Sequence, residues 1–125
     1  MSNPISDERT LAASELEAAL PAWHIYASPP ASIVPPCVVL APAQQGFSRT
    51  GHGGRIRYPF EAWLYTTGAD EGSLEALEQA LCWLLAVYLS AQPGNAPGAA
   101  SYGGQTFLGA SLILERELLI PVTAT

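Results

Sequence analysis

Apolar and polar side chains follow their most regular pattern in the middle of the chain, and this region predicts its two main elements. Residues 55–67 carry apolar side chains at every second position, as in a β-strand with one buried side. Residues 73–90 carry them at helical spacing, within an arc of about 100°. The pattern predicts a long strand and a long helix packed on it. The predicted core side of the strand is Ile56, Tyr58, Phe60, Ala62 and Leu64, and that of the helix is Leu74, Leu77, Leu81, Leu84, Leu85 and Tyr88.

Capping residues predict where this helix begins and ends. Ser73 is expected to be the N-cap, because its hydroxyl can accept a hydrogen bond from a backbone N–H of the first turn. Asp70 and Glu71 add negative charge near the positive end of the helix dipole. Pro93 and Gly94 are expected to end the helix.

A second apolar face on the same helix is centred on Trp83 and extends to Val87. A helix that is apolar almost all round is normally covered on two sides. Either the N-terminal segment or a second subunit could cover this face, and the second alternative makes Trp83 and Val87 interface residues. The apolar run is too short to cross a membrane, which takes about 20 residues.

The N-terminal third predicts one helix and two short strands. The helix is expected to begin at a cap formed by Ser6 or Asp7 and to end at Leu20. Residues 23–26 alternate like a short strand, and residues 37–41 form an apolar run typical of a buried strand.

Residues 44–54 form a glycine-rich connection between two predicted strands. The connection lacks the GK[ST] sequence and is followed by a strand, so phosphate binding is not expected. Its aromatic and basic side chains make it a candidate contact element, and the alternative is an ordinary solvent-exposed loop. The candidate contact residues are Phe47, Arg49, His52 and Arg55.

The other side of the long strand carries Arg57, Trp63 and Tyr65. Trp63 and Tyr65 would be exposed there unless another element covers them, so all three are candidate interface residues. A last strand is expected after residue 104, with a further short strand near Tyr102. Its apolar row is interrupted by Arg116, and the charged residues around Arg116 could pair with Arg57 across neighbouring strands.

The composition favours a single domain over residues 1–125 that associates with other proteins. The chain has a net charge of −6, and all five of its basic residues are arginines. An acidic surface argues against nucleic-acid binding, which depends on neutralising phosphates. Only 13% of the residues are charged, which leaves apolar surface to be covered by association. The polar N-terminus has no secretory signal, so a cytoplasmic protein is expected.

The sequence offers no catalytic, cofactor-binding or metal-binding motif. Cys37 and Cys82 lie among apolar residues and are expected to be buried, reduced thiols. His24 and His52 are far from both cysteines in the sequence, and there is no HExxH, CxxC or acidic calcium loop. We therefore expect a protein that is not an enzyme and uses no cofactor.

The order of these elements resembles the tail terminator (tail completion) proteins of bacteriophages with long, non-contractile tails. The resemblance covers nearly the whole chain and rests on four segments: LEAALPAWHIYASPP, IVPPCVVLAP, the run from RIRYPFEAWLYTT to ALCWLLAVYL, and TFLGASLILEREL. It consists of the order of the elements and the general character of their sequences. It includes no fixed motif from which residue roles could be transferred.

The resemblance implies an α+β fold: a mixed, mainly antiparallel sheet with an N-terminal helix and one long helix packed on it. It also implies a homo-oligomeric ring, usually of six subunits, at the head-proximal end of the tail in the virion, after assembly in the host cytoplasm. The ring would end tube polymerisation, contact the tail tube protein and a neck or head-completion protein, and let DNA pass without specific binding. The alternatives are another head–tail joining protein, or a small cytoplasmic ligand-binding or enzymatic domain.

Overall fold

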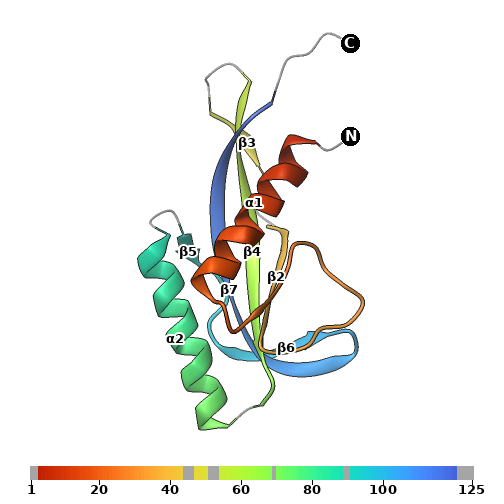
Figure 1. Ribbon diagram of the computed structural model, residues 1–125, viewed down its shortest axis with the longest axis vertical. Coiled ribbons are helices and arrows are strands. Elements are labelled where there is room, and N and C mark those ends of the chain that lie inside the picture. The colour runs from red at the N-terminus through yellow and green to blue at the C-terminus, as the bar shows by residue number, and fades with distance from the viewer. Residues whose placement is uncertain (1–2, 44–46, 51–53, 69, 89–90, 121–125) are drawn as a thin grey trace.

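The computed structural model describes residues 3–43, 47–50, 54–68, 70–88 and 91–120. They form an α+β fold in which both helices pack on a mixed, mainly antiparallel sheet, which confirms the expected fold class (Figure 1). None of the helices in this part of the chain is long and apolar enough to span a bilayer. In chain order the elements are α1 (Pro4–Ala19), β1 (His24–Tyr26), β2 (Cys37–Pro42), β3 (Ser48–Arg49), β4 (Arg55–Thr66), α2 (Glu71–Val87), β5 (Ala91–Pro93), β6 (Gly98–Tyr102) and β7 (Gln105–Leu119).

The sheet is built around the antiparallel pair β4 and β7, which stay in register along all 12 residues of β4. The strand order is β1-β2-β4-β7-β5, and only β1 and β2 run parallel. β3 pairs with the first half of β4, and β6 pairs with β7. In Figure 1 the β4–β7 ribbon runs along the length of the molecule, and its upper end projects past α1. We call residues 47–50 and 55–58, at this upper end, the arm.

The main core lies between the two helices and one face of the sheet. The alternation in β4 is confirmed, because Ile56, Phe60, Ala62 and Leu64 are all buried. Across the ladder, Phe60 pairs with Leu114. The core cluster draws on both helices and three strands; its largest members are Leu16, Leu40, Phe60, Leu64, Leu77, Leu84, Leu112 and Leu114.

The buried stripe of α2 differs from the predicted one by a rotation. Leu77, Ala80 and Leu84 are buried, whereas Leu85 is 38% exposed. Successive residues of a helix are about 100° apart around its axis. The buried face of α2 is centred on Leu77 and Leu84 and includes Ala80, and Leu85 lies outside it. The prediction was therefore wrong for Leu85. Ala80, which the predicted stripe did not include, belongs to the core.

Both helices begin earlier than predicted. Asp70 caps α2, and its carboxylate accepts a hydrogen bond from the backbone N–H of Ser73 at 2.7 Å. Asn3 caps α1 in the same way, and Pro4 takes the first helical position, where a missing N–H costs nothing. The predicted caps at Ser73 and at Ser6 or Asp7 were wrong, because an equally good capping residue stands three or four positions upstream.

The C-terminal ends differ in how well they were predicted. The first helix ends at Ala19 with Leu20 as its C-cap, as expected. The second ends at Val87, and residues 91–93 already form β5, so Pro93 and Gly94 do not end it. The end was placed too far along because the apolar run in the sequence continues to Leu89, past the last helical residue.

Pro59 occupies a central strand without losing a ladder hydrogen bond. Its carbonyl accepts from the backbone N–H of Ala43 at 3.2 Å, so its nitrogen faces the same neighbour. On that side β2 has ended at Pro42, and β3 pairs only with Arg57 and Ile56. The position is locally an edge, which is where proline is tolerated in a sheet.

The edge segment from β5 to β6 is held against Ser111 of β7. The backbone N–H of Asn95 donates to Ser111 Oγ at 2.8 Å, and this hydroxyl donates to a carboxylate oxygen of Glu61 at 2.9 Å. Gly94 donates its N–H to the Ser111 carbonyl at 3.0 Å. The approach is close: a Cβ at position 94 would lie 2.9 Å from that carbonyl oxygen.

We therefore expect Gly94→Ala to destabilise the fold by about 1–3 kcal/mol, because the β5–β6 segment would have to move away from β7. Gly72→Ala is the control, since its Cβ would meet nothing closer than Asp70 Oδ1 at 3.7 Å and it lies in the first turn of α2. That change should stabilise by up to about 1 kcal/mol. Urea unfolding of both variants measures the two effects. Equal midpoints would show that the segment does not pack against Ser111 in this way.

Candidate interaction site

A groove between α1 and α2 carries the largest exposed aromatic side chain of the helical layer. Trp83 is 53% exposed and Val87 is 48% exposed. Two hollows of about 380 and 510 Å³ meet at Ala19 and Trp83. We call this surface the helix groove, and its apolar lining includes Ala18, Ala19, Trp23, Ala80, Trp83 and Val87.

The first helix borders the groove but does not cover it. α1 supplies small side chains on its side, so Trp83 keeps about half of its surface in solvent. The first alternative from the sequence, in which the N-terminal segment covers Trp83, is thus met only in part. Trp23, which precedes β1, forms part of the floor. Its position beside Trp83 has no signal in the sequence, because the two residues lie on separate elements.

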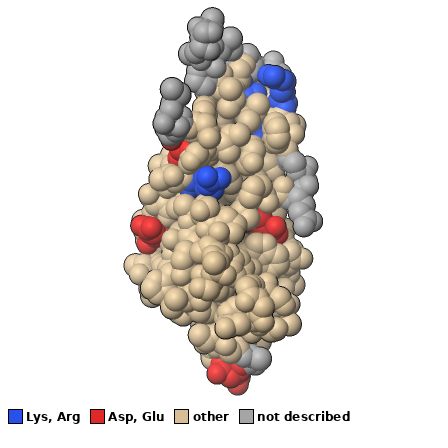
Figure 2. Space-filling view, turned by 90° about the vertical axis from the view of Figure 1, so that its right-hand side faces the viewer, with Lys and Arg blue, Asp and Glu red and all other residues tan. Residues whose placement is uncertain are grey.

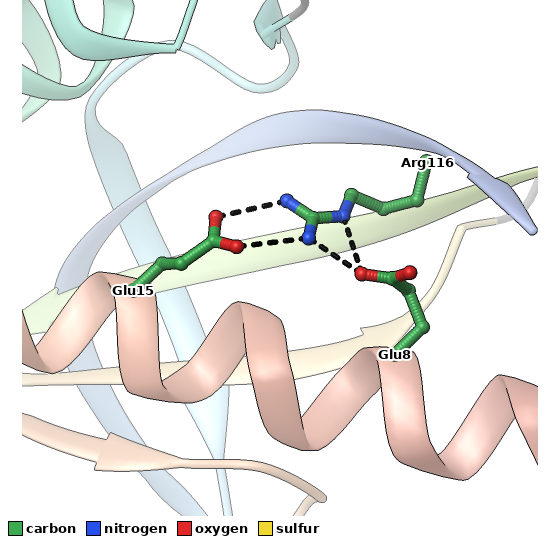
Figure 3. A network of polar contacts seen from close by, with 3 residues as sticks. All are labelled: Glu8, Glu15 and Arg116. Atoms are coloured by element: carbon green, nitrogen blue, oxygen red, sulfur yellow. Dashed lines mark hydrogen bonds and ion pairs between the residues drawn. The ribbon is translucent and has the colours of Figure 1, made fainter.

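An ion-pair cluster fixes the position of α1 and hence the width of the groove. Arg116 of β7 lies between two carboxylates of α1 (Figure 3). Its Nε donates to Glu8 at 3.0 Å, and a terminal nitrogen donates to Glu15 at 2.9 Å. The hydrogen bonds from Arg116 lower the pKa of Glu15 below its usual range, and the two carboxylates raise the pKa of Arg116. Each partner therefore stabilises the charged form of the other.

The expected pairing of Arg57 with the charged residues around Arg116 is confirmed for Glu115, which lies 3.2 Å from Arg57. Arg116 itself faces the helices, opposite Tyr58 in the register. In the sequence, the one sign of an unusual role for Arg116 was that it interrupts the apolar row of the last strand. The partners could not be found from it because they lie about a hundred residues earlier in the chain.

The arm exposes a second apolar and basic surface. Phe47 is 64% exposed, and its ring stacks on that of Tyr58 with centroids 5.4 Å apart. Arg49 is exposed and forms no ion pair with any residue that the structure describes. Arg55 lies 3.9 Å from Glu117, a loose and exposed pair that is worth little. His52, the fourth candidate of this loop, lies outside the described residues.

Trp63 and Tyr65 belong to a second, smaller core and not to an open surface. Tyr65 is 5% exposed, and its ring lies edge-on to those of Tyr102 and Phe107. Residues 27–36 close over this face, since the Tyr102 hydroxyl donates to the Pro30 carbonyl and the Val34 N–H donates to the Tyr26 hydroxyl. Burial raises the pKa of Tyr65 to about 12. The expectation of an interface was wrong for Tyr65, and Trp63 is half-buried beside it.

The two cysteines lie in different environments, and one prediction about them was wrong. Cys37 is fully buried, and desolvation raises the pKa of its thiol to about 11, so it stays protonated and unreactive at neutral pH. The sheet register places His24 beside it on β1, a proximity that the sequence could not show. Cys82 is exposed on α2, although its apolar neighbours predicted burial. The described residues contain no group of three or more metal-ligating side chains.

The helices carry mostly acidic side chains: α1 contains Asp7, Glu8, Glu15 and Glu17 besides Arg9, and α2 contains Glu71, Glu75 and Glu78. The arm carries three of the five arginines of the chain. Two of these, Arg55 and Arg57, are paired with Glu117 and Glu115 of β7. Figure 2 shows basic atoms in the upper half of the visible face and acidic atoms both at its lower end and around mid-height, near a basic group. Comparison of the sequence with models of known protein families finds no match, and neither does comparison with curated proteins.

Proposed function

We propose that this protein is a structural virion subunit, a tail terminator of a long-tailed bacteriophage. In this role it assembles with copies of itself into a ring, hexameric as the resemblance implies, at the head-proximal end of the tail. The ring ends polymerisation of the tail tube and presents its other side to a neck or head-completion protein. DNA passes through it without specific binding, and an acidic ring would not retain it.

The observation that carries the proposal is the half-exposed Trp83 in the helix groove. Large aromatic side chains contribute strongly when a partner removes them from water, and they are enriched at the centres of interfaces. The chain folds its other aromatic residues of this size, Trp23 and Trp63, at least partly into its own clusters. An open Trp83 on a chain of few charges therefore supports association with protein.

The fold adds a second line of support. The α+β arrangement is the one that the resemblance implies for a tail terminator, with both helices on one face of a mixed sheet. A closed ring also needs two different contact surfaces on each subunit. The arm and the helix groove are two such surfaces, one projecting and one hollowed.

The test is the variant Trp83→Ser in a phage that carries this gene. The variant should still fold, with only a modest fall in the unfolding midpoint because about half of the side chain is already exposed, and it should fail to form rings. Tails made with it should have irregular, extended lengths in electron micrographs. Val34→Ser is the control, because Val34 is 59% exposed in the loop that covers the other face of the sheet. Tails of regular length from Trp83→Ser, or a purified wild-type protein that does not bind the ends of tail tubes, would contradict the proposed function.

A further inference from the structure

We propose that residues 27–36 form a strap that opens as one unit while the sheet beneath it stays folded. The strap connects β1 to β2 and crosses the face of the sheet opposite the helices. In Figure 1 it is the wide orange loop that reaches the turn between β6 and β7. The inference goes beyond the proposed function and does not rest on it, because the movement takes place within a single copy.

The strap buries little of its own surface. It contains no helix or strand, and none of its ten residues is buried. Ile33 packs against the second core and is only half-buried, and Val34 is 59% exposed. Segments with few buried apolar contacts and few hydrogen bonds open at low free energy. Four residues of the strap also have no backbone N–H with which to hold it down: Pro29, Pro30, Pro35 and Pro36.

Two tyrosine hydroxyls hold the strap on the sheet. The hydroxyl of Tyr102 on β6 donates to the carbonyl of Pro30, and the backbone N–H of Val34 donates to the hydroxyl of Tyr26 at 3.2 Å. Within the described part of the chain, these are the two hydrogen bonds that tie the middle of the strap to the rest of the protein. Each contributes little net stability, because water replaces the lost partner when the strap lifts.

The two ends of the strap stay in place when it opens. β1 and β2 run side by side with His24 opposite Cys37, and the N–H of His24 donates to the carbonyl of Pro36 at 3.0 Å. β2 in turn pairs with β4 along all six of its residues. A loop of this length whose ends are held close together is a compact surface loop of the Ω type. It can lift without separating the strands that flank it.

A buried thiol beneath the strap reports whether it is open. Cys37 is 0% exposed, and burial raises its pKa to about 11, so the thiol is inert while the strap is closed. Cys37 lies in the second core with Tyr65, and Ile33 of the strap packs against this cluster. When the strap lifts, water reaches the sulfur, the desolvation that raised the pKa is relieved, and the thiol becomes reactive.

Thiol labelling in a Cys82→Ser background tests the movement, because this change removes the exposed cysteine. Cys37 loses its proton to the buffer, and its thiolate attacks the disulfide of dithiobis-nitrobenzoate. A mixed disulfide forms and one thionitrobenzoate anion is released, whose absorbance gives the rate. Labelling should proceed without urea, and its rate should depend on urea much less than global unfolding does, since opening the strap exposes little surface.

Two tyrosine variants separate opening of the strap from unfolding of the chain. Tyr102→Phe should speed the labelling of Cys37 about fivefold, the effect of losing one hydrogen bond. Hydrogen exchange at the Val34 N–H should speed by the same factor, although this N–H is bonded to Tyr26. Tyr88→Phe is the matched control, because its hydroxyl lies beside Glu15 on the helical side of the sheet. It should lower the unfolding midpoint and leave both rates unchanged.

Three results would overturn the inference. Labelling of Cys37 with the urea dependence of global unfolding would show that the strap and the sheet unfold together. Faster labelling in Tyr102→Phe without faster exchange at Val34 would show that the strap does not open as one unit. A labelling rate that Tyr102→Phe leaves unchanged would show that the reagent reaches Cys37 by a route that does not involve the strap.

Discussion

Phe60→Ala is expected to lower the free energy of unfolding by about 3–5 kcal/mol, the range for removing a large aromatic side chain from a core. Phe60 is fully buried in β4, between paired strands on both sides. Its ring lies 5.0 Å from that of Tyr58, and helices cover its face of the sheet. Because domains of this size are stable by only about 5–15 kcal/mol, the variant should be close to unfolding at physiological temperature. Urea denaturation followed by circular dichroism measures the loss.

Phe47→Ala is the matched control, because it makes the same change at the arm end of the same ribbon. Phe47 is largely exposed and should lose only its stacking on Tyr58, about 0.5–1.5 kcal/mol. Similar losses of stability from both changes would mean that the arm packs against the core or that Phe60 lies outside it.

Arg116→Met is expected to cost about 3 kcal/mol, because it leaves two carboxylates of α1 without their cation. Complete removal of one partner from a buried ion pair typically costs about 3–5 kcal/mol. The lower figure applies here, because the side chains of Glu8 and Glu15 are only partly buried, with 19% and 36% of their surface exposed to solvent. The triple variant Arg116→Met, Glu8→Leu, Glu15→Met should recover most of the loss, since an apolar contact can replace a partly buried ion pair. Calorimetry of both variants measures these changes. A triple variant as unstable as the single one would show that the hydrogen bonds are needed for the position of α1.

The dependence on pH distinguishes this cluster from simple packing. Arg116 lowers the pKa of Glu15 below its ordinary value of 4.5. The stabilisation from Glu15 is therefore fully present above about pH 4.5 and is lost as the pH falls through the lower value of the folded state. In Arg116→Met this contribution is absent, so the difference in stability between wild type and variant should shrink as the solution is acidified. A difference that stays constant across this range would exclude an ionic origin.

Periodicity in the sequence predicted the architecture because the burial of one side of an element repeats along it. The alternation in β4 placed Phe60 and Leu64 in the core, and the apolar row of β7 was likewise correct around Leu112. Residues at the boundary of a pattern were harder to place. Leu85 and Cys82 are apolar residues of α2 that lie outside its buried arc, and only the position of α1 decides where that arc ends.

The candidate site was predicted in part, for a similar reason. Trp83 and Phe47 stood out because each is a large apolar residue outside the core pattern, and both are exposed. Tyr65 had the same appearance in the sequence but is covered by residues 27–36, a segment without regular structure whose course no periodicity predicts. The pairing of Arg116 with Glu8 and Glu15 depends on the tertiary fold and has no local signal.

The link between α1 and β7 also has a consequence for the order of events during translation. Arg116 and its partners are separated by 108 and 101 residues of chain, which a ribosome needs roughly 5–20 s to synthesise. During that interval α1 lacks both its ionic anchor and the strand on which it rests. The groove, one wall of which is α1, can form only once β7 has left the ribosome.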